Sequence, residues 1–336
     1  MKEKETTAMY LILKQQENWA NGKKLVSGKI IDGKESKDKN YLETIEDNIF
    51  PVDNTKGLTP KNIKAYNKGG GSETKTITHR PKMSALHSSS ALVVNLFQYW
   101  QEKKDITPLL KALKLEIGNN NNKIGGNAIG FEEILQIKYM DGNKEKNVRG
   151  GKPNIDVVIE FGDKIIAIES KFTEPYINES DKNSKMQDSY IEKESLWREI
   201  PHIEKLANAI HAQNYQIENC KIKESIDNLR KTKRLDAAQL IKHILGLRTD
   251  DNEKISKYKE NFTLLYLWYD VPGTEESKEH QKEIEAFASI AKADGIDFRH
   301  ITYQKVISYL NENYKNEHKD YIDYLVERYY KHPSTL

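Results

Sequence analysis

The chain has 336 residues, enough for one large domain or two of ordinary size, and its 37% hydrophobic content suffices for a core. Its 53 basic and 51 acidic residues leave a net charge of only +2, so any basic surface must come from segregation of the charges in space. The single cysteine, Cys220, excludes an intramolecular disulfide and a multi-cysteine zinc site.

The first 79 residues show little of the pattern of a compact core. They begin without the basic-then-apolar order of a signal peptide, and no apolar run in the chain approaches the ~20 residues that span a bilayer. Lys-, Asp-, Asn- and Gly-rich segments follow, ending in Asn67-Lys-Gly-Gly-Gly-Ser-Glu-Thr, which is typical of a flexible connection. We expect a cytoplasmic protein that does not enter membranes, with residues 1–79 as an arm or small subdomain and residues 80–336 as the main domain. The arm either grips the substrate or is a variable appendage.

A buried helix opens the main domain. A serine caps it, and the following residues up to Trp100 are nearly all apolar, too many for one amphipathic stripe. Asn95 lies inside this helix and needs a hydrogen-bond partner, and His87 lies just before the cap. We assign structural roles to both. A short helix over 106–116 and a Gly- and Asn-rich loop, interpreted as a surface insertion, come next.

Three strands are predicted after these helices. Residues 131–139 alternate roughly with period two and stop at the hairpin signal Asp141-Gly142. Residues 154–161 and 164–172 form the second and third strands, joined by the Gly162-Asp163 turn. The resulting element order is α-β-β-β.

The rest of the chain alternates helices and strands. Residues 185–247 are helical in character, and the amphipathic segment 235–246 is expected to end with Gly246 as its C-cap. Residues 261–269 are apolar on both faces, as in a central strand, and lead to a helix over 275–293, a strand over 298–303 and a helix over 304–313. A strand, a crossover helix and another strand predict an α/β fold in which helices flank a mixed central β-sheet.

Three charged residues interrupt the apolar hairpin formed by the second and third strands: Asp156, Glu169 and Lys171. Because burying an unpaired charge is costly, such charges indicate a function. Side chains alternate along a strand, so Glu169 and Lys171 project from one face. Antiparallel pairing around the turn places Asp156 opposite Glu169, and carboxylates so close repel each other unless a divalent cation binds or one of them is protonated.

Oxygen ligands of this kind suit Mg²⁺. A lysine beside them can assist deprotonation of an attacking water or stabilise developing negative charge. The hairpin therefore predicts metal-assisted phosphodiester hydrolysis. The other reading is a solvent-exposed edge with a surface salt bridge, and the apolar flanks of both strands argue against it.

These residues resemble the PD-(D/E)XK nuclease superfamily. The resemblance rests on Pro153-Asn-Ile-Asp156, a spacer, then Glu169-Ser-Lys171, and on the α-β-β-β-α-β order around them. Further stretches resemble a bacterial branch described as restriction-endonuclease-like: His87-Ser-Ser-Ser-Ala-Leu, Phe131-Glu132, Glu169-Ser-Lys-Phe-Thr-Glu174 and Gln239-Leu-Ile-Lys-His243. The resemblance covers roughly residues 80–310 and implies a restriction-endonuclease-like αβββαβ core with an N-terminal extension.

The resemblance implies a role for each matching residue. Asp156, Glu169 and the backbone carbonyl of Ser170 become metal ligands, and Lys171 activates or orients the attacking water. A further acidic residue is expected from the preceding strand: Glu132 matches best, with its neighbour Glu133 as the alternative. Pro153 departs from the family pattern because two residues separate it from Asp156, and we expect it to shape only the start of the strand.

Strand context carries this prediction, because the tripeptide Glu-Ser-Lys alone is uninformative. It also occurs at Glu35-Ser36-Lys37, in a polar loop, and at Glu276-Ser277-Lys278, at a predicted helix start. Only Glu169-Ser170-Lys171 follows an apolar strand and has an aspartate one hairpin upstream.

Four residues are predicted to contact DNA. Arg149 and Lys152 precede the strand of Asp156, where they contact a phosphate or form a solvated turn. Gln239 and Lys242 lie on a helix expected to cover the site. The cluster Arg230-Lys-Thr-Lys-Arg234 either follows a DNA backbone or is a hydrated surface, and Glu174 is interpreted as a structural partner. The histidine spacings argue against zinc, and no phosphate-binding P-loop is present.

The sequence thus predicts a Mg²⁺-dependent endodeoxyribonuclease, for which Mn²⁺ can substitute, of a restriction or bacterial defence type. DNA is the expected partner, and double-strand cleavage would suit a homodimer. The alternatives are a DNA-repair or structure-specific nuclease, a non-catalytic nucleic-acid-binding protein on the same scaffold, and an interaction protein with a chance motif.

Overall fold

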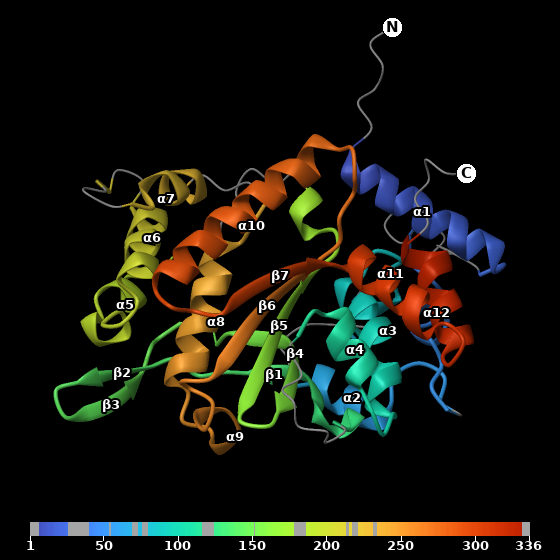
Figure 1. The fold of residues 1–336 in the computed structure, drawn as a ribbon, viewed down its shortest axis with the longest axis horizontal. Helices are drawn as coiled ribbons and strands as arrows, with labels where there is room; N and C mark the ends of the chain where they lie inside the picture. Colours follow the sequence, from blue (N-terminus) through green and yellow to red (C-terminus); the bar gives the residue numbers. More distant parts are fainter. Residues whose placement is uncertain are drawn as a thin grey trace, which may run out of the picture.

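A five-stranded mixed sheet forms the centre of the computed structural model, which describes residues 7–25, 40–53, 55–68, 73–75, 80–115, 124–150, 152–177, 186–212, 215–216, 221–230 and 234–330. The strand order is β1-β4-β5-β6-β7 (Figure 1). The first three pair antiparallel and the last three pair parallel. Their bounds are β1 Ile129–Ile134, β4 Asn154–Phe161, β5 Lys164–Lys171, β6 Phe262–Trp268 and β7 Phe298–Thr302.

The β4–β5 hairpin has the predicted register. Val157 pairs with Ile168 and Phe161 pairs with Lys164, so the two-residue turn lies at Gly162-Asp163. Gly162 has a φ of 59°, a left-handed conformation that glycine adopts without steric cost. The prediction of these two strands is confirmed, apart from the last residue of β5.

The single strand predicted over residues 131–139 is wrong. Strand β1 ends at Ile134, and β2 (Lys138–Asp141) and β3 (Lys144–Asn147) form a separate two-stranded sheet, with Gly142 in their turn. The backbone N–H of Gln136 donates to Asp250 Oδ2 at 2.6 Å, and that of Lys138 donates to Thr249 Oγ1 at 3.0 Å. These bonds to residues far along the chain draw the backbone out of the central sheet.

Helices cover both faces of the central sheet, so the predicted α/β architecture is confirmed (Figure 1). One layer contains α3 (Ser89–Gln101), α4 (Thr107–Ala112), α11 (Tyr303–Tyr314) and α12 (Lys319–Leu325). The other contains α6 (Pro201–His211), α7 (Lys223–Leu229), α8 (Ala237–Thr249) and α10 (Glu275–Ala293). Helix α10 is the crossover between the parallel strands β6 and β7.

The remaining helical elements are short, apart from α1. They are α1 (Ala8–Gly22), α2 (Pro60–Tyr66), α5 (Asp188–Ile191), α9 (Glu253–Ser256), the 3₁₀ turns Glu46–Asn48, Lys82–Ser84, Gly126–Ala128, Glu174–Tyr176 and Glu194–Leu196, and a π-helical turn, Val326–Tyr330.

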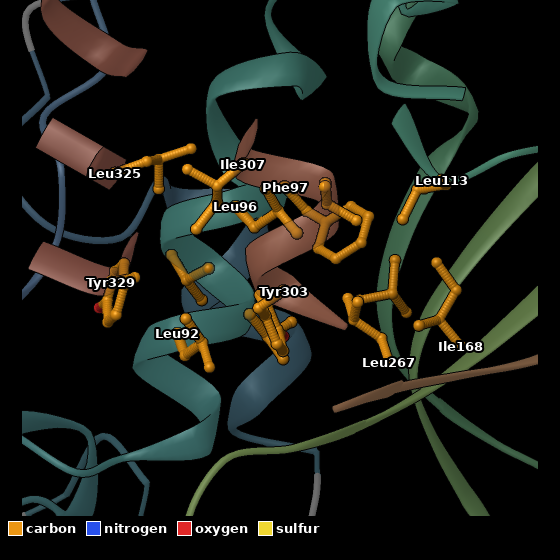
Figure 2. Packing of buried hydrophobic residues seen from close by; sticks show 14 of the residues in the cluster. Leu92, Leu96, Phe97, Leu113, Ile168, Leu267, Tyr303, Ile307, Leu325 and Tyr329 are labelled. Atoms are coloured by element: carbon orange, nitrogen blue, oxygen red, sulfur yellow. The ribbon is translucent and has the colours of Figure 1, made fainter. Parts of the chain in front are cut away.

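The larger apolar cluster lies between the sheet and the layer of α3 and α11. In Figure 2, Leu96 and Phe97 of α3 lie beside Ile307 of α11, while Ile168 and Leu267 project toward them from β5 and β6. Alternation along β5 and β6 sends their other side chains into the second cluster, under α8 and α10. Both faces of the sheet are therefore packed against apolar side chains, and polar side chains on the sheet are exceptions.

Helix α3 begins as predicted. The side chain of Ser88 caps it by accepting a hydrogen bond from the Ala91 N–H at 3.1 Å. Asn95, buried in its middle, accepts from the Phe50 N–H at 2.6 Å and donates to the Asn48 carbonyl at 2.9 Å. These bonds satisfy the buried amide, which confirms its structural role.

Residues before position 80 contribute to the larger apolar cluster through Ala8, Ile12, Ile49, Leu58 and Tyr66. Helix α1 lies beside the C-terminal helices (Figure 1), and the amides of Gln15 and Gln16 donate to the Arg328 carbonyl at 2.9 and 3.0 Å. Within the predicted flexible run at 67–74, residues 69–72 lie outside the described residues. The boundary at residue 79 stays a prediction.

Gly246 is not a C-cap, which corrects the sequence-based expectation. Helix α8 continues through it to Thr249. A Cβ at this position would lie 2.9 Å from Leu135 Cδ1 and 3.0 Å from the ring of Pro153. The glycine is therefore required by close packing of α8 against the chain before β4, and Pro153 forms part of that contact.

Within the described ranges, no helix is both long and apolar enough to cross a membrane.

Candidate active site

The β4–β5 hairpin brings the predicted carboxylates together. Asp156, near the start of β4, accepts a hydrogen bond from the Ser170 N–H through Oδ2 at 2.7 Å. Glu169 and Lys171 follow on one face of β5, as alternation requires, and this bond holds Asp156 against them. Glu169 is only 1% exposed, so this is a desolvated carboxylate in the sheet.

Glu169 has a partner at each oxygen. Its Oε1 lies 2.6 Å from Lys171 Nζ, and its Oε2 lies 2.8 Å from His243 Nε2. Burial opposes ionisation of this carboxyl, but the attraction of Lys171 and His243 outweighs it and lowers the pKa of Glu169 to about 2. Glu169 is therefore a firmly ionised carboxylate.

Lys171 is a firmly charged ammonium. Besides Glu169, it donates to Gln239 Oε1 at 2.9 Å. Burial opposes its charge, but Glu169, Glu174 and Asp156 attract the ammonium and together raise its pKa above the usual value. In this arrangement the side chain is a donor and a source of positive charge, since it holds its proton.

Asp156 has the opposite electrostatic environment. Burial raises the pKa of Asp156 well above its usual value, and the negative charges of Glu169 and Glu132 raise it further. The attraction of Lys171 and the hydrogen bond from Ser170 only partly offset these effects. The site thus holds more carboxyl groups than its one ammonium can neutralise, and without a further cation Asp156 favours its protonated form.

Glu132 is the acidic neighbour that joins this cluster. The β1–β4 register pairs Phe131 with Val157 and Glu133 with Ile155, which sets Glu132 across from Asp156. Its φ of 55° is left-handed and rare for a non-glycine residue in a strand, a form of strain that concentrates at functional sites. Burial raises the pKa of Glu132 to about 7, although a hydrogen bond from Asn154 opposes the rise.

Glu133, the alternative, has a different environment. Its Oε2 lies 2.7 Å from the ammonium of Lys254, in α9. Of the two neighbours, the structure thus brings Glu132 and not Glu133 to Asp156.

Helix α8 packs on β5 and contacts both of its charged residues. Asp236 caps it, accepting from the Gln239 N–H at 2.8 Å. Gln239 and His243, four residues apart, lie on one face and contact Lys171 and Glu169 respectively. His243 was given no role from sequence; its spacing from Gln239 is a signal that could have indicated one.

The backbone around Ser170 also faces this cluster. Successive residues of a strand direct their backbone groups to opposite neighbours. The Ser170 N–H points to Asp156, and the Lys171 carbonyl accepts from the Tyr269 N–H on the other side at 2.9 Å. The Ser170 carbonyl is therefore directed toward Asp156. The hydroxyl of Ser170 bonds to that of Tyr303 at 2.6 Å, a contact that the sequence did not predict.

The structure gives less support for the residues that are predicted to contact DNA. Arg149 and Lys152 are exposed on the segment before β4, and Gly150 between them lies against Tyr190. The ammonium of Lys242 lies 6.0 Å from the centroid of the same Tyr190 ring. Gln239 points instead at Lys171. Residues 231–233 of the predicted basic cluster lie outside the described part of the chain.

Glu174 and His87 have structural surroundings. Glu174 accepts from the Ser89 hydroxyl and, at 2.9 Å, from the Phe172 N–H. The carbonyl of His87 accepts from Thr173 Oγ1 at 3.4 Å. Together these contacts tie the start of α3 to the end of β5.

The donor set fits a hard divalent cation. Asp156, Glu169 and Glu132 supply carboxylate oxygens, and their mutual repulsion is the kind that a cation relieves. Among the residues that the structure describes, no three His, Cys, Asp or Glu side chains already converge closely enough to hold one. Lys171 and His243 occupy the two oxygens of Glu169.

Comparison with known proteins identifies a family for this chain. The family model described as restriction endonuclease associating with ARP matches residues 13–330, a span that includes the whole central sheet and all the site residues above. No curated protein and no solved structure matches the chain.

Proposed function

The chain belongs to the family described as restriction endonuclease associating with ARP, and we propose on that basis that it is a Mg²⁺-dependent endodeoxyribonuclease of a restriction or defence system. One observation carries the proposal beyond family membership. The β4–β5 hairpin, in a sheet with apolar packing on both faces, holds Asp156 against Glu169. Lys171 Nζ lies 2.6 Å from Glu169 Oε1. Buried charges so arranged are costly to the fold and suit hydrolysis of a phosphodiester.

The carboxylates of Asp156, Glu169 and Glu132 and the Ser170 carbonyl would hold the cation. When bound, Mg²⁺ would supply Lewis-acid activation of water and neutralise charge on the phosphate; Mn²⁺ has the same ligand preferences and is the expected substitute. His243 and Gln239 keep Glu169 and Lys171 in place during this chemistry.

Lys171 acts as a charged donor. Since its ammonium holds its proton, it orients the attacking water and stabilises the negative charge that develops on the phosphoryl oxygens. Water attacks phosphorus, the bond from phosphorus to the 3′ oxygen breaks, and the products carry a 5′-phosphate and a 3′-hydroxyl. The attacking water releases one proton to solvent, and the departing 3′ oxygen takes up one proton from solvent to become the hydroxyl.

Contacts to DNA are assigned to three cations near the site, of which Arg149 and Lys152 are exposed and Lys242 is half-buried. Arg149 and Lys152 precede β4, and Lys242 lies on the helix above β5, at the Tyr190 ring that Gly150 also approaches. Phosphate contacts of this type position a duplex without reading its sequence. One such site cuts one strand, so double-strand cleavage would suit two copies acting together as a homodimer.

The experiment is incubation of the purified chain with plasmid and genomic DNA, with Mg²⁺, with Mn²⁺ and with EDTA, followed by mapping of the ends. We expect cation-dependent cleavage with 5′-phosphate ends, and a loss of about 10²- to 10³-fold in rate for Lys171→Ala. Lys254→Ala, which removes the partner of Glu133, is the matched control and should cut normally. Wild-type cleavage by Lys171→Ala would refute the assignment.

A second candidate is a nucleic-acid-binding protein that does not cut. It is favoured by one observation: Lys171 and His243 already occupy both oxygens of Glu169. Binding to DNA without cleavage in both Mg²⁺ and Mn²⁺ would support it. Mapped ends that follow a DNA structure instead of a sequence would indicate a repair-type nuclease.

A further inference from the structure

The hydroxyl of Tyr66 is buried and has no hydrogen-bond partner within the described ranges. Tyr66 is the last residue of α2, in the segment before position 80, and is 2% exposed. Among the described residues nothing accepts from or donates to its oxygen. An unsatisfied buried hydroxyl destabilises the fold, so it calls for an explanation.

Helix α2 is firmly held, so this placement is not incidental. Thr59 caps it, and Asn62 Nδ2 donates to Gln98 Oε1 at 2.8 Å and to Gln101 Oε1 at 2.7 Å. Lys61 Nζ donates to the carbonyl of Ile129, the first residue of β1, at 3.3 Å. These bonds fix α2 to α3 and to the edge strand of the sheet.

The ring of Tyr66 packs on the strand that carries Glu132. Its centroid lies 5.9 Å from that of Phe131, the residue before Glu132, with 34° between the ring planes. Glu132 in turn lies across from Asp156. Burial raises the pKa of Tyr66 well above its usual value, and the charges of Glu132, Asp156 and Glu73 raise it further, in that order.

The Tyr66 hydroxyl bonds to none of these carboxyl groups and to no other described residue, so it is free to donate to a ligand. The hydroxyl keeps its proton at neutral pH, because burial and the surrounding negative charge both oppose its loss. It is therefore a neutral, buried donor packed against the strand that carries Glu132. A phosphate oxygen that approaches Asp156 and Glu132 together with a cation would be a strong acceptor for it.

We propose that Tyr66 is a substrate-contacting residue of the nuclease site, whose hydroxyl donates a hydrogen bond to an oxygen of the phosphate being cleaved. This inference rests on the proposed function and deepens it. It assigns part of the site to the segment before residue 80, for which the sequence predicts only an arm or appendage. The segment before residue 80 then contributes a substrate-contacting side chain to the site.

The test is Tyr66→Phe in the full-length chain, which keeps the ring and removes only the hydroxyl. Without cation or DNA, its melting temperature should equal or exceed that of the wild type, because a group with no partner has been removed. With Mg²⁺ and plasmid, kcat should fall about 10- to 100-fold, the range for one hydrogen bond to a charged group. KM should change less, since the bond is made mainly to the reacting phosphate.

The control is Tyr321→Phe. The Tyr321 hydroxyl donates to the Leu96 carbonyl at 2.6 Å and accepts from Trp100 Nε1 at 3.1 Å, in the apolar layer of α12. Removing that hydroxyl should lower the melting temperature and leave kcat unchanged. The two variants should therefore show opposite patterns.

A lowered melting temperature with wild-type kcat in Tyr66→Phe would overturn the inference, because it would mean that a buried water satisfies the hydroxyl. If the wild-type chain cuts DNA and Tyr66→Phe cuts it equally fast, only this inference fails. If the wild-type chain cuts nothing in Mg²⁺ or Mn²⁺, the proposed function itself fails and this inference fails with it.

Discussion

Two buried charged clusters in this protein are built in opposite ways. One surrounds Arg328, in the π-helical turn near the C-terminus, and the other is the cluster of Asp156, Glu169 and Lys171. Both remove charge from water, which costs several kcal/mol before any compensation. They differ in how completely the surrounding groups compensate.

Arg328 is fully buried and has no acidic partner among the described residues, and neutral groups satisfy it. Its guanidinium donates to Gln16 Oε1 at 2.9 Å, to the Asn48 carbonyl at 2.8 Å and to the Tyr324 hydroxyl at 2.6 Å. It also lies 4.0 Å from the centroid of the Trp19 ring. This cluster joins the segment before residue 80 to the C-terminal helices.

The carboxylates at the β4–β5 hairpin are compensated only in part. Glu169 has two cationic or polar partners, but Asp156 and Glu132 are held beside it with raised pKa values. Satisfied buried charge is what a fold uses to fix its own parts, whereas uncompensated charge of one sign is what a site uses to attract a ligand. The comparison predicts different responses to mutation and pH.

Arg328→Ala should have the largest effect. It leaves Gln16 Oε1 and Asn48 Oδ1 buried with no donor among the described residues, so the free energy of unfolding should fall by about 3–5 kcal/mol. Arg328→Lys keeps the charge but not the planar fork and should lose less. Urea unfolding measures both, and a loss below about 1 kcal/mol for Arg328→Ala would show that the cluster is not structural.

Glu132 should make stability depend on pH. Its folded pKa of about 7 exceeds the unfolded value, so its protonated form favours the fold. That contribution is complete below about pH 4.5 and is lost as pH rises toward 7, with a slope of up to about 1.4 kcal/mol per pH unit. Glu132→Gln should remove this part of the slope in unfolding measured in EDTA. An identical pH profile for the variant would contradict the assignment.

His243→Leu should act on the site through Glu169. The leucine fills the space but cannot hold Glu169 Oε2, so cleavage should fall about 10- to 100-fold, the usual range for a group that orients a metal ligand. His243→Gln, which can still donate, should recover part of the loss. Affinity for Ca²⁺, measured by calorimetry, should follow the same order. Equal loss in both variants would indicate a role in packing alone.

The hairpin could be predicted because its information is local. Two strands joined by a two-residue turn have one register, so the position of Gly162 determines which residue faces Glu169. Strand β1 was predicted too long because long-range bonds from Gln136 and Lys138 to the end of α8 pull the chain out of the sheet.

The remaining members of the site depend on how distant helices dock. His243 and Tyr66 are an ordinary histidine and tyrosine in sequence, and only the packing of α8 on β5 and of α2 on β1 gives them their positions. Gly246 could not be interpreted from local sequence either. Its place near the end of α8 is typical of a C-cap, but the structure requires a glycine there because Leu135 and Pro153 leave no space for a Cβ.

The most direct test of the central claim, that the crowded carboxylates bind a divalent cation, is thermal unfolding of the wild type and of Asp156→Asn in EDTA and in millimolar Mg²⁺ or Mn²⁺. The wild type should be stabilised, by about 1.4 kcal/mol at ten times the dissociation constant. Asp156→Asn, which keeps an acceptor for the Ser170 N–H but removes a repelling charge, should melt higher than the wild type in EDTA and should not respond to either cation. A wild type whose melting temperature is the same with and without both cations, or a variant that responds equally, would contradict the account.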